Sequence, residues 1–95
     1  MRPTVHSNGT SASELLGQLE NVGGALVTAI KALEGAAPNG RDYYPQGESA
    51  IHEAREEHDA RLQRLRIVYG EILAMHQGVA DQVDEYLREA SEGRP

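Results

Sequence analysis

The chain has 95 residues, of which 25% are charged, with a formal net charge of −6 and no cysteine. This length allows one small domain, and the lack of cysteine excludes disulfides and thiolate metal sites. The acidic balance disfavours nucleic acid and anionic membranes as partners, because both select for surplus Lys and Arg. Tyrosine is the only aromatic residue type. Such a composition favours packed helices over a β-sandwich.

Residues 1–10 are small and polar, and we expect them to form a disordered leader. No apolar run follows Met1 that would make a secretory signal. Nor does any stretch approach the roughly 20 apolar residues that cross a bilayer. We therefore expect a cytoplasmic protein that does not bind membranes.

A first helix is predicted at about residues 11–34. Its start has the form of a capping box, in which the Ser11 hydroxyl and the Glu14 carboxylate each satisfy a free backbone N–H. Gly35 is expected to end the helix in the left-handed conformation. Apolar residues recur at helical spacing between these two ends: Leu15, Leu16, Leu19, Val22, Leu26, Val27, Ile30 and Leu33.

The connector, residues 35–46, contains the sequence Pro-Asn-Gly at 38–40, which predicts a turn. Directly after it come Arg41, Asp42, Tyr43 and Tyr44, which are a candidate site for recognition of a partner. Tyr and Arg are the residue types most enriched at binding hot spots. The alternative is structural: a tyrosine packs on the first turns of the next helix, and Asp42 caps that helix.

A second helix is predicted at about residues 47–91, followed by a short tail at 93–95, so the helical hairpin domain covers 11–92. Two apolar columns, each with a seven-residue period, alternate along this helix and indicate packing against another helix. One column is Ile51, His58, Leu65, Ile72, Val79 and Tyr86; the other is Arg55, Leu62, Tyr69, His76, Val83 and Ala90. The fold class is therefore all-α, an antiparallel helical hairpin with a long second helix.

The two predicted helices differ in length by nearly a factor of two. In a hairpin that brings Leu33 near Ile51, and Leu15 near Tyr69 or Ile72, the second helix overhangs beyond Ile72. The overhang is apolar, and self-association would cover it, most simply in a homodimer of the four-helix-bundle type. The predicted oligomer interface comprises Ile72, Leu73, Met75, His76, Val79, Val83, Tyr86 and Leu87.

Two histidines, His58 and His76, lie within the apolar columns. A polar residue in such a seam commonly fixes the register or the oligomeric state. The alternative is a pH-sensitive seam, because a histidine gains charge at about pH 6.5 in the absence of perturbation.

No metal or catalytic motif is complete. His52-Glu53 begins like the zinc motif His-Glu-x-x-His, but Glu56 replaces the second histidine. A looser surface site of Glu48, His52 and Glu56 is geometrically feasible, although a solvated polar face explains the same spacing. We find no activated nucleophile and no phosphate-binding loop, so we expect no enzyme activity, no cofactor and no bound metal.

The sequence therefore favours a non-catalytic helical oligomer that acts through protein–protein contacts, as an adaptor, assembly or regulatory subunit. A homodimer is the favoured assembly, and a further protein partner is compatible with the connector. The alternative is a bundle that binds a ligand or metal through His58, Tyr69 and His76 in its interior. A DNA-binding regulator fits the acidic charge poorly.

Overall fold

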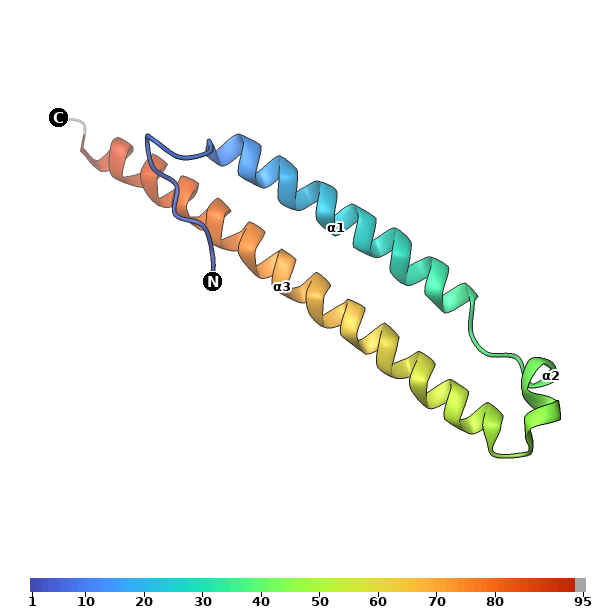
Figure 1. Ribbon diagram of the computed structural model, residues 1–95. Coiled ribbons are helices and arrows are strands. Elements are labelled where there is room, and N and C mark those ends of the chain that lie inside the picture. The colour runs from blue at the N-terminus through green and yellow to red at the C-terminus, as the bar shows by residue number, and fades with distance from the viewer. Residues whose placement is uncertain (94–95) are drawn as a thin grey trace. The chain divides into compact units, whose positions relative to one another are not determined.

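A computed structural model describes residues 1–93 of the chain. These residues form the helices α1 (Ala12–Gly35), α2 (Gly40–Tyr43) and α3 (Ala50–Glu92), with a short 3₁₀ helix η1 (Tyr44–Gln46) after α2 (Figure 1). The described part of the chain contains no strand, which confirms the all-α class. Of the predicted tail, residues 94 and 95 lie outside the described range.

The chain divides into two compact units. The terminal unit contains residues 1–24, with the first half of α1, and the residues from Gly70 onward, with the second half of α3. The central unit contains residues 25–69, with the rest of both long helices, α2 and η1.

The start of α1 follows the predicted cap, whereas its end does not. The backbone N–H of Glu14 donates to the Ser11 hydroxyl at 3.1 Å. At the other end, Gly35 is the last helical residue and its φ is not positive, so the expected left-handed cap is wrong. The chain leaves α1 instead through tight bonds between residues three apart: the N–H of Ala36 donates to the carbonyl of Leu33 at 3.0 Å.

The connector of the central unit is helical rather than a simple turn. The side chain of Asn39 caps α2, because its Oδ1 accepts a hydrogen bond from the N–H of Arg41 at 3.0 Å. Asp42, which the sequence suggested as a cap of the long helix, lies instead within α2. Pro45 lies in the first turn of η1, which suits its fixed φ. Gly47 then turns the chain at φ +107°, where a side chain would be strained. This turn explains why α3 begins at Ala50, later than the predicted residue 47.

In the central unit, α3 buries one face. Ala54, His58 and Leu62 follow one another at four-residue spacing and are each less than 10% exposed. Ala54 takes the place that the predicted column assigned to Arg55, which is exposed. A four-residue step keeps successive side chains on nearly the same side of a helix, so Ala54 is aligned with His58 and Arg55 is rotated away from it.

The register predicted for the hairpin is wrong. In the central unit, a carboxylate oxygen of Glu34, at the end of α1, lies 4.0 Å from a guanidinium nitrogen of Arg66. The end of α1 is therefore not beside the start of α3. In the terminal unit, a carboxylate oxygen of Glu20 lies 3.1 Å from Nε2 of His76. Ala12, at the start of α1, and Val83 of α3 line the same groove, which measures about 540 Å³. Residues 36–49 contain α2 and η1, and this length of chain lets α1 pair farther along α3 than a tight turn would. The pairing is antiparallel in the terminal unit, as predicted.

The corrected register shortens the predicted overhang. Val79 is fully buried, and Gly23 and Gly78 are buried with it in the terminal unit. From Asp84 to Glu92, by contrast, every residue of α3 is exposed. The uncovered part of α3 therefore begins after Val83 rather than after Ile72. Among the described helices, none is long and apolar enough to cross a membrane.

Candidate interaction surface

The leader, for which we expected no fixed structure, lies on α3 within the terminal unit. The backbone N–H of Val5 donates to Oε1 of Gln82 at 2.8 Å. The Nε2 group of Gln82 donates to the carbonyl of Pro3 at 2.8 Å and to that of Gly78, one turn earlier in α3, at 3.2 Å. Both amide hydrogens and the amide oxygen thus have partners, which fixes the orientation of the side chain. Gln82 holds the leader through backbone atoms alone.

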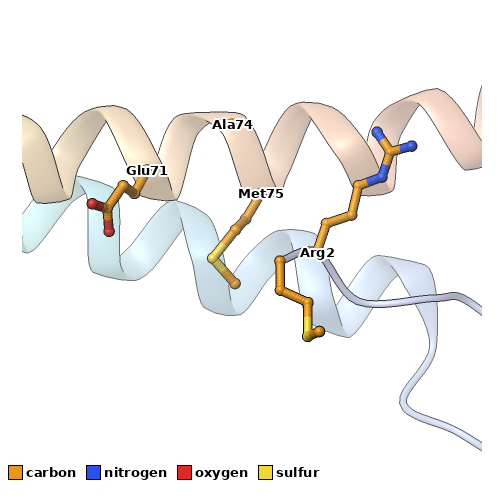
Figure 2. Close-up of a pocket in the computed structure, with 5 residues that line it drawn as sticks. Arg2, Glu71, Ala74 and Met75 are labelled. Atoms are coloured by element: carbon orange, nitrogen blue, oxygen red, sulfur yellow. The ribbon is translucent and has the colours of Figure 1, made fainter.

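Arg2 lies against a glycine of α3. A Cβ added at Gly78 would come within 2.5 Å of Cδ of Arg2, so the leader approaches the helix closely at this point. Met1 and Arg2, with Glu71, Ala74 and Met75, line an open groove of about 420 Å³. Figure 2 shows Glu71, Ala74 and Met75 on neighbouring turns of α3, with Arg2 alongside. The leader thereby lies beside Met75 of α3, which the sequence assigned to the oligomer interface.

A second groove lies at the C-terminal end of the same surface. It measures about 460 Å³ and is lined mostly by apolar side chains. Val5 of the leader, Ala12 of α1 and Val83 of α3 contribute to it, and so do Tyr86 and Leu87, which are 70% and 60% exposed. We call the set Val5, Ala12, Gln82, Val83, Tyr86 and Leu87 the terminal groove.

The structure divides the predicted oligomer interface into three parts. Val79 is fully buried within the chain, so it offers no surface to a partner. Partly covered are Ile72, Met75, His76 and Val83. Leu73, Tyr86 and Leu87 remain at least half exposed. Nothing in a single chain tests whether these three bind a second copy, so the interface stays a prediction.

The two seam histidines have different surroundings. In the terminal unit, Nε2 of His76 lies 3.1 Å from a carboxylate oxygen of Glu20. A carboxylate only accepts, so this contact is a hydrogen bond in the forms of His76 that carry a proton on Nε2. His58, in the central unit, is only 6% exposed. Among the described residues, no buried side-chain nitrogen or oxygen lacks a hydrogen-bond partner. The pH-sensitive seam remains a prediction.

The connector places its four candidate residues in the central unit. Arg41 and Asp42 are exposed, whereas Tyr43 is partly covered and lines a groove of about 280 Å³ with Ile51 at the start of α3. This position agrees with the structural alternative for Tyr43. Tyr44 also reaches the groove but is 83% exposed, so it stays available to a partner.

The residues proposed to bind a metal do not form a cluster. Within the described residues 1–93, no group of three His, Cys, Asp or Glu side chains is placed to hold a metal ion, including Glu48, His52 and Glu56. Of the seam residues proposed to bind a ligand, His58 and Tyr69 belong to the central unit and His76 to the terminal unit.

Sequence reasoning missed Gln82 and the leader as parts of this surface. The signal in α3 was weak: Gln82 is a polar residue between Val79 of one apolar column and Val83 of the other. The leader carried no signal, because Gln82 binds its backbone and backbone groups are the same for every sequence. Comparison with protein families, with curated proteins and with solved structures gave no match to this chain.

Proposed function

We propose that this chain is a non-catalytic helical module that acts through protein–protein contacts and self-associates as a homodimer through its terminal groove. The observation that carries the proposal is the exposure of Tyr86 and Leu87 beside that groove. They lie after Val83, where every described residue of α3 is exposed. Large apolar side chains that cluster around a groove are typical of interaction sites rather than of free surface.

The physical argument rests on what a second copy would bury. Full burial of a side chain such as that of Leu87 contributes about 1.5–3 kcal/mol relative to exposure. In a two-fold dimer each residue of the surface is buried twice, once per copy. A chain of 95 residues without cysteine has a small core and no covalent staple, and this is the class of protein in which oligomerisation supplies stability.

The test is sedimentation equilibrium of the full chain and of two matched variants. Leu87→Glu places a charge in the proposed interface and is expected to raise the dimer dissociation constant by at least tenfold, or about 1.4 kcal/mol. Ile67→Glu likewise replaces an exposed aliphatic side chain with a charge, at another site of α3 and at a residue that is 52% exposed. This control is expected to leave the dissociation constant unchanged.

Two results would count against the proposal. A wild-type chain that stays monomeric at high concentration would remove self-association altogether. A dimer that Ile67→Glu and Leu87→Glu weaken equally would show that the interface is not centred on the terminal groove. Circular dichroism of both variants checks that each remains helical.

A further inference from the structure

The contact between the leader and Gln82 does not depend on the side chains of the leader. Gln82 binds the carbonyl of Pro3 and the N–H of Val5, which flank Thr4. In an extended chain, the carbonyl of one residue and the N–H of the residue two positions later face the same side. In a sheet, both groups bond to a neighbouring strand. The amide of Gln82 takes the place of that strand. Such a site accepts any segment that presents the same backbone groups.

Few contacts hold the leader to its own chain. Met1, Arg2 and Thr4 are exposed, and Pro3 and Val5 are only partly covered. Besides the two bonds to Gln82, the described contacts are the approach of Arg2 to Gly78, the open groove that Met1 and Arg2 line with Met75, and the place of Val5 in the terminal groove. Segments held by so few contacts open at a low free-energy cost.

The second half of the leader, between Val5 and α1, is built like a hinge. Residues 6–10 are polar, and they contain a turn in which the N–H of Gly9 donates to the carbonyl of His6 at 3.2 Å. When this turn opens, residues 6–11 span up to roughly 20 Å at about 3.3–3.6 Å per residue. Exchange of a terminal segment through such a hinge is a common route to dimers.

We propose that residues 1–5 exchange between two copies, so that the leader of each copy binds Gln82 of the other. The proposal rests on the proposed function, because the terminal groove must first bring two copies together. Val5 belongs to that groove, and so does Gln82. A partner seated there therefore places its own leader close to the second Gln82. Each bond to Gln82 then forms between copies with the same atoms as within one copy.

Proximity favours the closed arrangement in a monomer, but it does not favour it over the exchanged arrangement in a dimer. A tethered segment meets its own site at an effective concentration in the millimolar range, which favours the closed chain while the protein is monomeric. Inside a dimer, the leader of the second copy is present at a similar effective concentration. Exchange then gains from any contact that the opened hinge makes with the partner.

The experiment uses two isotopic forms of the full chain. Equal amounts of ¹⁵N-labelled and ¹³C-labelled chains are unfolded, mixed and refolded at a concentration where sedimentation shows a dimer. A filtered nuclear Overhauser experiment then detects only contacts between the amide proton of Val5 in one copy and the side-chain protons of Gln82 in another. We expect this intermolecular signal in the mixed sample.

Matched variants identify the atoms responsible. Gln82→Met keeps the Cβ and Cγ protons that report the contact but removes the amide that accepts from the Val5 N–H and donates to Pro3, so it is expected to abolish the signal. Gln63→Met makes the same change in α3 at an exposed residue and is expected to leave the signal intact. Persistence of the signal in Gln82→Met would overturn the role of Gln82.

The remaining outcomes separate this proposal from the proposed function. If a dimer forms but the signal is absent from the mixed sample, and appears only in a separate control sample of chains that carry both labels, the leader stays on its own chain and exchange is wrong. If sedimentation shows a monomer at every concentration, the proposed function fails and exchange fails with it.

Discussion

At the scale of single residues, the terminal unit depends on a few positions where the chain is closely packed. Val79 is the one fully buried large side chain among those described, and Gly78 beside it admits the leader. The apolar columns of the sequence predicted Val79 as a seam residue because its position follows from helical periodicity. They did not identify Gly78, since periodicity describes side chains and Gly78 acts by having none.

Val79→Ala is expected to lower the free energy of unfolding by about 2 kcal/mol, because it removes buried methyl groups and leaves a cavity. Val68→Ala is the matched control. It makes the same change in α3 at a residue that is 41% exposed, and its expected effect is within about 0.5 kcal/mol. Urea unfolding of both variants measures the difference. Equal effects would contradict the packing assigned to Val79.

A pair of glycine variants tests the approach of Arg2 to α3. Gly70 has open space where a Cβ would be added, so Gly70→Ala is expected to stabilise the helix by about 1 kcal/mol. Gly78→Ala makes the same change, but the new Cβ would meet the side chain of Arg2. We expect a smaller gain, or a loss, in thermal unfolding. The same gain at both positions would show that the leader does not lie over Gly78.

At the scale of elements, local signals located the helices well and their pairing poorly. Ser11 and the proline-free run after Pro45 placed both long helices within a few residues of their observed bounds. The register failed because the connector was treated as a turn, whereas Asn39 caps a further helix within it. Register depends on how much chain the connector spans, and a heptad pattern fits several registers equally well.

The N-terminal cap of α1 can be tested with a single substitution. Ser11→Ala removes the acceptor for the N–H of Glu14 and is expected to cost about 1 kcal/mol of stability. Ser13→Ala is the control, since Ser13 is exposed in the same first turn and makes no side-chain hydrogen bond in the structure. Chemical denaturation of the two variants gives the comparison. A cost at Ser13 equal to that at Ser11 would exclude the cap as the cause.

At the scale of the whole molecule, the sequence correctly predicted an all-α protein, and it placed Tyr86 and Leu87 in the candidate interface. Those residues stay exposed because α3 continues past the start of α1. The leader was missed as part of the surface because its attachment depends on tertiary contacts with Gln82. Composition describes how a segment behaves alone, and the tertiary surroundings of the leader override that tendency.

The central claim, that the terminal groove is a self-association surface, is tested most directly by nuclear magnetic resonance of the ¹⁵N-labelled chain during dilution. Dissociation of the dimer is expected to shift the amide signals of residues 83–90 and of Val5. Signals of Ala54, His58 and Leu62, on the buried face of the central unit, are expected to stay fixed. Spectra that do not change over the whole concentration range, or changes confined to residues 41–44, would contradict the claim.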